Sequence, residues 1–66
     1  MTIPTPHQLR VLNEEAELAE RHAKLLAFVL SDKIKTVSVD ENDCLFRQES
    51  MMRAYLDVLR ERIANF

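Results

Sequence analysis

The chain has 66 residues and a mass of 7.7 kDa, which is enough for one small domain. It contains no glycine, so neither a glycine-rich phosphate-binding loop nor a β-fold built on tight primed turns is expected. Nine Lys and Arg residues against eleven Asp and Glu residues give a formal net charge of −2, which argues against binding to duplex nucleic acid. No apolar stretch reaches the ~18 residues of a membrane span, and no signal peptide is recognisable. The sequence therefore predicts a small, intracellular, mostly helical protein.

The first helix is expected to begin after a short lead-in, MTIPTP, that holds both prolines. Thr5 is placed to cap this helix, Pro6 suits its first position, and Gln8 completes a capping box with Thr5. The helix is predicted over about residues 6–30. Its apolar residues recur at the three- and four-residue steps of a heptad seam: Leu9, Leu12, Ala16, Ala19, Ala23, Leu26 and Leu30. A second apolar stripe beside it contains Leu18, Leu25 and Val29.

A turn and a second helix follow. The segment SDKIKTVS is rich in residues that favour turns and caps, so a turn is expected over about residues 31–37. Ser38 and Glu41 form another capping box, which predicts a helix over about residues 38–64. One broad apolar stripe of this helix contains Leu45, Met52, Leu56, Leu59, Ile63 and Phe66. A neighbouring stripe repeats every seven residues at Cys44, Met51 and Val58.

Two helices of matched length joined by a short turn predict an all-α, antiparallel two-helix hairpin that forms a single domain over residues 1–66. A hairpin buries only one face of each helix, whereas each helix here has two apolar stripes. Below about 70 residues a lone core is seldom sufficient. The surplus stripes therefore predict that hairpins associate into a homo-oligomeric helical bundle.

No pattern in the sequence indicates a catalytic or metal centre. His7 and His22 are too far apart to share a metal as an HxxxH pair, and both are expected at the surface. Cys44 has no base partner in the sequence and lies on an apolar stripe, which predicts a buried, inert thiol. We therefore expect neither an enzyme nor a bound metal or other cofactor.

The basic residues are dispersed over both helices and the turn, and two interpretations of them remain open. They can form a solvated flank that compensates the helix dipoles. Alternatively, they can form an anion site between chains, with guanidinium groups on phosphates and Tyr55 against a base. Arg62 stands at heptad spacing in the series Tyr55, Leu59, Arg62 and Phe66, so packing along that series would bury it beside an anion, either an acidic side chain of another chain or a ligand phosphate.

The run FVLSDKIKTVSVDENDCLFRQESMMRAYLDVLRERI resembles the second half of a helical-hairpin family found in tailed-phage genomes. The positions that match the family's pattern without a gap are Phe28, Val29, Ser31, Lys33, Ile34, Val37, Glu41, Cys44, Leu45, Gln48, Met52, Tyr55, Leu59, Arg62 and Ile63. The charged first helix fits the family as well. Two departures are that Ile34 stands where an aromatic residue is expected, and that the chain is short, close to the hairpin alone.

This resemblance implies a phage anti-defence protein. The family contains anti-CBASS and anti-Thoeris sponges, which bind the cyclic nucleotide signals of bacterial immune systems without degrading them, in the cytoplasm of the infected host. Its members are oligomers, with hexamers described, and their ligands lie in pockets between protomers. The implied ligand is a cyclic oligonucleotide, with no membrane and no duplex nucleic acid as partner.

Six residues are candidates for binding that ligand. The matched motif supports Lys33, Tyr55 and Arg62, whereas Arg10, Arg21 and Lys24 are included because they are basic residues of the first helix. The alternative from another class of function is a structural or protein-binding helical hairpin, an accessory phage protein that docks on a host factor through its second apolar stripe. A helical nucleic-acid binder ranks third because of the acidic balance.

Overall fold

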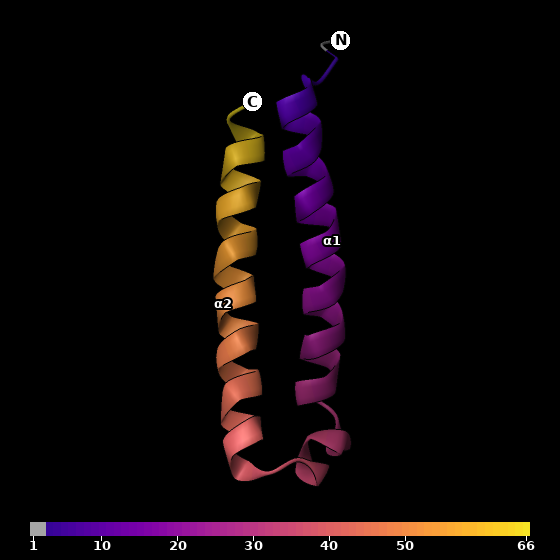
Figure 1. Cartoon of the computed structure of the whole chain (residues 1–66), viewed down its shortest axis with the longest axis vertical. Helices are drawn as coiled ribbons and strands as arrows, with labels where there is room; N and C mark the ends of the chain where they lie inside the picture. The colour runs from indigo at the N-terminus through magenta and orange to yellow at the C-terminus, as the bar shows by residue number, and fades with distance from the viewer. Residues whose placement is uncertain (1–2) are drawn as a thin grey trace.

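The computed structural model describes residues 3–66, which form a hairpin of two long helices (Figure 1). Helix α1 comprises Pro6–Val29, a short 3₁₀ helix η1 comprises Asp32–Thr36, and helix α2 comprises Val39–Ala64. Within the described residues no strand is present, so the prediction of an all-α, antiparallel two-helix hairpin is confirmed. Part of the expected extended lead-in, residues 1–2, lies outside the described residues.

The start of α1 is fixed by the expected capping box. The Thr5 side chain accepts a hydrogen bond from the Gln8 backbone N–H at 3.2 Å, and the Gln8 side chain accepts one from the Thr5 N–H at 2.9 Å. Pro6 occupies the first helical position, where its missing N–H costs nothing. Two otherwise orphaned donors are thereby satisfied, which explains why the helix begins at this residue.

The chain reverses direction without glycine. Ser31 caps η1 by accepting a hydrogen bond from the Lys33 N–H, and Ser38 caps α2 by accepting one from the Glu41 N–H at 3.2 Å. Between them Val37 is extended, and no residue from 3 to 66 has a positive φ. Since every turn residue stays in conformations open to any L-amino acid, the absence of glycine is compatible with the tight reversal.

The two helices pack through one heptad-spaced seam, which we call the inner seam. Its buried apolar residues are Val11 and Leu18 of α1 and Leu56 and Leu59 of α2, with Ala19, Met52 and Ile63 half-buried against them. Val29 is buried near the closed end. The stripe that contains Leu18 and Val29 therefore faces α2, whereas the longer seam that starts at Leu9 is covered only along one edge: Leu9, Ala16, Ala23 and Leu30 are exposed.

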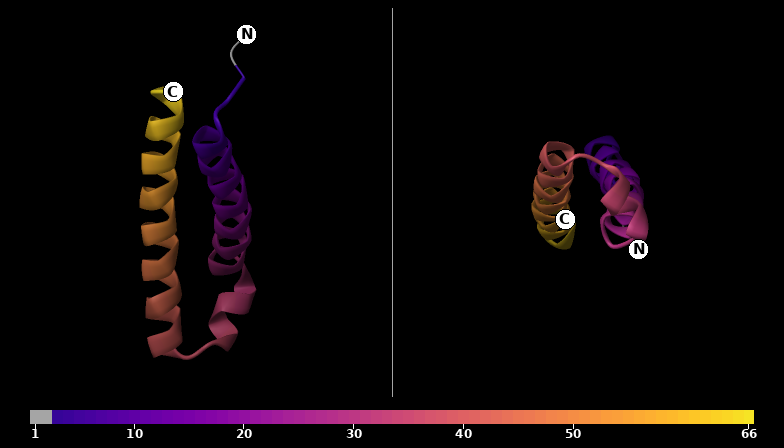
Figure 2. Two further views of the ribbon diagram at one scale, coloured as in Figure 1. Left: turned by 45° about the horizontal axis from the view of Figure 1, so that its top comes forward. Right: turned by 90° about the horizontal axis from the view of Figure 1, so that it is seen from below.

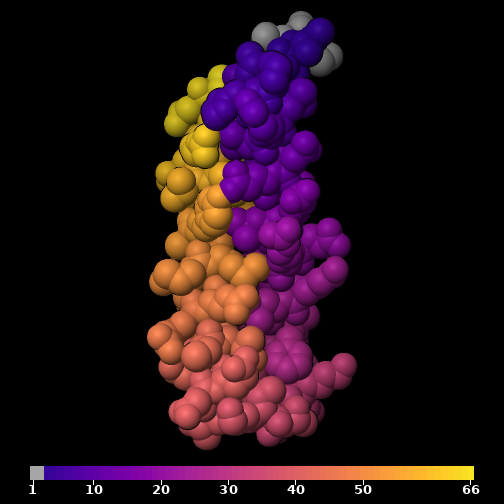
Figure 3. Space-filling model, in the orientation of Figure 1, coloured from indigo at the N-terminus to yellow at the C-terminus, as the bar shows by residue number. Residues whose placement is uncertain are grey.

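The hairpin is long and only one layer thick. Its extents are 49 × 14 × 14 Å, and both termini lie at the same end (Figure 2). An ion pair between Arg60 Nε and Glu15 Oε1 at 3.2 Å joins the helices near that end. Because nothing covers the outer faces, Met51, Tyr55 and Val58 stay 69%, 44% and 52% exposed on α2. On the face drawn in Figure 3, α1 forms one side of the surface and α2 the other, and the turn region between them forms the lower end.

Candidate functional site

The predicted ligand residues lie at separate levels of the hairpin. Arg10 stands near the start of α1 and Arg62 near the end of α2, so the antiparallel course places both at the open end. Lys33 belongs to η1 at the closed end. Because the molecule is 49 Å long, a ligand much shorter than the hairpin cannot contact Lys33 and Arg62 of the same chain.

The two central candidates already have carboxylate partners within their own helix. Arg21 Nη2 lies 3.8 Å from Glu17 Oε2, and Lys24 Nζ lies 3.2 Å from Glu20 Oε1. Both pairs are exposed, so they add little to stability, but each cation shares its charge with a nearby carboxylate. Among residues 3–66, by contrast, no ion pair involves the other three cations of the predicted set: Arg10, Lys33 and Arg62.

Tyr55 and Arg62 share an exposed face of α2, which we call the outer stripe. Its members follow heptad spacing and are all exposed: Cys44, Gln48, Met51, Tyr55, Val58 and Arg62. The outer stripe lies beside the inner seam on the same helix and combines apolar side chains with one phenol and one guanidinium. A flat, partly apolar ligand with negative charge is chemically complementary to such a face.

One prediction about this stripe is wrong: Cys44 was expected to be a buried, inert thiol, yet its side chain is exposed. Arg62 is exposed in the single chain as well, and its burial beside an anion of another chain or of a ligand stays a prediction. The reason is common to both: α1 packs on the stripe of α2 that contains Leu56 and Leu59, so the neighbouring stripe faces away from α1.

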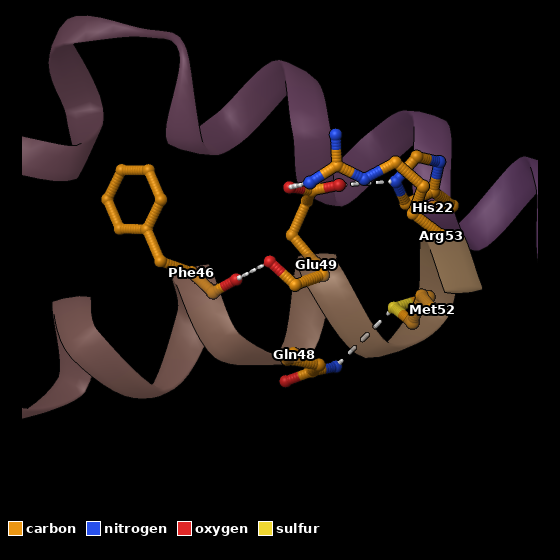
Figure 4. Close-up of polar contacts among 7 residues, drawn as sticks. His22, Phe46, Gln48, Glu49, Met52 and Arg53 are labelled. Atoms are coloured by element: carbon orange, nitrogen blue, oxygen red, sulfur yellow. Dashed lines mark hydrogen bonds and ion pairs between the residues drawn. The ribbon is translucent and has the colours of Figure 1, made fainter. Parts of the chain in front are cut away.

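A polar cluster in the inner seam joins the helices near their middle (Figure 4). His22 Nε2 and Glu49 Oε2 are 2.8 Å apart, and the other carboxylate oxygen accepts a hydrogen bond from Arg53 Nη2 at 3.3 Å. The side chains of His22 and Glu49 are only 14% and 9% exposed. The prediction that His22 is a surface histidine is therefore wrong, whereas His7 is exposed as expected.

The sequence does contain a signal for this cluster. His22 stands between Leu18 and Leu25 at steps of four and three, and Glu49 stands between Leu45 and Met52 at the same steps. Each is the polar member of an otherwise apolar heptad series, and buried charges in proteins are usually paired. Periodicity does not tell which stripe of each helix faces the other helix. His22 and Glu49 meet because the stripes that contain them face each other.

Three further observations limit the kinds of site that the described part of the chain can form. Residues 3–66 form no surface pocket. They contain no group of three or more His, Cys, Asp or Glu side chains that could hold a metal ion. Neither helix over those residues is long and apolar enough to cross a membrane. A ligand that contacts the predicted residues of one chain alone therefore lies on an open surface.

Comparison with known proteins identifies a family for the chain. Neither the curated proteins nor the solved structures give a match. The model of the Sequestin family, in contrast, matches residues 5–65, from the N-cap of α1 to the C-cap of α2. This span holds both helices, the turn and all six predicted ligand residues, and the family's name denotes sequestration, which is binding rather than catalysis. The sequence resemblance to a sequestering anti-defence family is thus confirmed, and the chain belongs to the Sequestin family.

Proposed function

We propose that this protein sequesters a cyclic nucleotide signal of bacterial immunity in sites formed between copies of the chain. The bound nucleotide is not degraded. The observation that carries the proposal is the outer stripe, where Tyr55 and Arg62 stand exposed on one face of a chain that has no pocket of its own over residues 3–66. Membership of a family named for sequestration supports binding as the activity.

The chemistry of the stripe suits such a ligand. A cyclic di- or trinucleotide has two or three phosphates and as many flat bases. Arginine can form two parallel hydrogen bonds with a phosphate, and a tyrosine ring can cover the face of a base. Met51 and Val58 extend the apolar surface beside Tyr55. In this proposal Arg62 and Lys33 neutralise phosphate, while Arg10, Arg21 and Lys24 add positive charge from α1.

Assembly is part of the proposal, because one hairpin cannot enclose a ligand. When a site lies on a symmetry axis, one arginine per chain acts twice. A homo-oligomer, with a hexamer as the expected size, would also cover the apolar residues that one hairpin leaves exposed. The expected place of action is the cytoplasm of an infected bacterial host.

A thermal-shift assay with a panel of cyclic di- and trinucleotides and cyclic ADP-ribose isomers tests the proposal. A bound nucleotide stabilises the folded state by mass action, so a ligand present at 100 times its Kd should add about 2.7 kcal/mol and raise Tm. Denaturation of the complex followed by chromatography should then recover the intact nucleotide. A panel without any shift contradicts the proposal, and recovery of linear or monomeric products would show an enzyme instead.

Substitution of Arg62 by alanine should weaken nucleotide binding and leave the assembly intact. The guanidinium is exposed and forms no ion pair over residues 3–66, so the folded chain loses no contact when it is removed. Loss of one charged hydrogen-bond donor to a phosphate should cost about 1.5–3 kcal/mol, or roughly 10- to 150-fold in Kd. Calorimetry measures the affinity and light scattering the assembly.

The control for that variant is Lys35→Ala, because Lys35 is also an exposed cation but lies in η1, outside the outer stripe, and its exposed ion pair with Asp32 adds little to stability. Its removal should leave nucleotide affinity unchanged. If Arg62→Ala instead binds nucleotide normally, Arg62 does not belong to the site. If it dissociates the oligomer without ligand, Arg62 contacts a neighbouring chain rather than phosphate.

One observation favours a second candidate function, a hairpin that docks on another protein. The outer stripe exposes the apolar side chains of Met51 and Val58, and exposed apolar side chains are typical of surfaces that bind other proteins. A hairpin with this function would bind none of the nucleotides in the panel, and its Tm would not change.

A further inference from the structure

The outer stripe of α2 leaves apolar surface uncovered on a chain whose own core is small. Within residues 3–66 the buried apolar residues are Val11, Leu18, Val29, Leu56 and Leu59. Met51, Tyr55 and Val58 of the outer stripe repeat at heptad steps and remain 69%, 44% and 52% exposed. Apolar residues at this spacing form the seam of a coiled coil, so another helix that runs along α2 would cover them.

The charges beside the stripe decide the direction of that second helix. Arg47, Ala54 and Glu61 are seven residues apart and border the stripe on the side away from α1. A parallel copy of α2 would set equal charges at equal heights. An antiparallel copy would set Arg47 diagonally across from the partner's Glu61, and Glu61 from the partner's Arg47, about 3 Å apart along the helix axis, while the small Ala54, one residue from the two-fold axis, lets the helices approach closely.

Arg47 is available for this contact. Its nearest carboxylate in the chain is Asp43 Oδ2 at 3.1 Å, in an exposed pair that contributes little to stability. Opposite charges across an interface fix orientation and register more than they add affinity. The order of positive, small and negative along this edge therefore selects one orientation of a second copy.

We propose that two copies of this chain pair through their outer stripes, with the two α2 helices antiparallel and a two-fold axis close to Ala54. In this register Met51 packs opposite the partner's Tyr55, and Gln48 opposite the partner's Val58. The open end of one copy then lies beside the closed end of the other, so Arg62 and the partner's Lys33 meet at the same end of the pair. The pairing shares Tyr55 with the proposed nucleotide site, where one face of the ring packs on the partner's Met51 and the other is left for a base, and the pairing itself is tested without ligand.

Disulfide trapping between two different single-cysteine variants tests the orientation. In a Cys44→Ser background, Gln48→Cys and Val58→Cys are prepared separately. Residue 48 lies opposite residue 58 of the partner, whereas two copies of residue 48, or of residue 58, are about 15 Å apart along the axis. A disulfide needs Cα atoms within about 7 Å. Under mild oxidation the mixture should give covalent dimers with one chain of each variant, and each variant alone should stay uncrosslinked.

The unmodified chain is a built-in control, because its only cysteine lies on the same stripe. The two copies of Cys44 would be about 27 Å apart in the antiparallel pair, so oxidation should not link them. Rapid self-crosslinking of Cys44, or of either single variant, would overturn the antiparallel orientation. So would a mixture that stays uncrosslinked although circular dichroism shows both variants fully helical.

Charge reversal gives an independent measurement that needs no cysteine. Arg47→Glu places like charges opposite each other twice in the pair, so its dimer Kd should rise by about tenfold or more. Arg47→Glu combined with Glu61→Arg in the same chain should restore the original Kd. Asp57→Lys, an exposed reversal outside the stripe and its border, should leave the Kd unchanged. Equal sedimentation of all four proteins, or a monomeric unmodified chain at micromolar concentration, would overturn the proposal.

Discussion

Replacing Leu59 by alanine is expected to lower the free energy of unfolding by about 2–5 kcal/mol. Among residues 3–66, Leu59 is the residue with 0% exposure, and it lies in the middle of the inner seam. The substitution removes its apolar contacts and leaves a cavity that two straight helices cannot close. A domain of this size is stabilised by roughly 3–10 kcal/mol, so the variant should lose a large share of its total stability. Urea unfolding followed by circular dichroism, at one fixed protein concentration, measures the change.

Leu30→Ala is the matched control for that experiment. It is the same substitution on the same hairpin, but the Leu30 side chain is 76% exposed. Its free energy of unfolding should stay within about 0.5 kcal/mol of the unmodified protein. Equal stability losses for the two variants would show that the stripe containing Leu59 is not the core.

The second large effect is expected at the buried contact between His22 and Glu49. His22→Leu should lower the free energy of unfolding by about 2–4 kcal/mol. The reason is that the Glu49 carboxylate, 9% exposed, would keep only the hydrogen bond from Arg53 on its outer side. Thermal and urea unfolding of the single variant measure this loss.

The double variant His22→Leu/Glu49→Leu should recover most of that stability, because two apolar side chains can replace a buried pair at little cost. Glu17→Gln is the control, since it breaks an exposed pair with Arg21 and should change stability by less than about 0.5 kcal/mol. A double variant less stable than His22→Leu would contradict this expectation. It would show that the contact between His22 and Glu49 does more for the hairpin than satisfy a buried carboxylate.

The sequence predicts the backbone of this protein well because local signals determine it. Thr5 with Gln8 specifies where α1 starts, and the heptad spacing with the polar turn specifies two antiparallel helices. These signals act within one or two turns of helix, so a single sequence is sufficient to recognise them.

The rotation of the two helices about their axes could not be predicted in the same way. Periodicity finds two apolar stripes on each helix but not which stripe meets the other helix, since both satisfy the spacing. That choice decides whether His22 is paired or solvated and whether Cys44 is buried or exposed. The predicted ligand residues depend on it as well, because their mutual distances are set by contacts between chains rather than by spacing within one.

The continuity of both helices has a consequence for the speed at which a ligand is captured. After Pro6 the chain contains neither proline nor glycine, and the reversal between α1 and α2 is a short 3₁₀ helix held by serine caps. Neither helix therefore contains a hinge of the kind that opens and closes a lid. Association rates should accordingly follow encounter and electrostatic attraction, without a slow gating step. How long a ligand stays bound would be governed by the lifetime of the contacts between subunits.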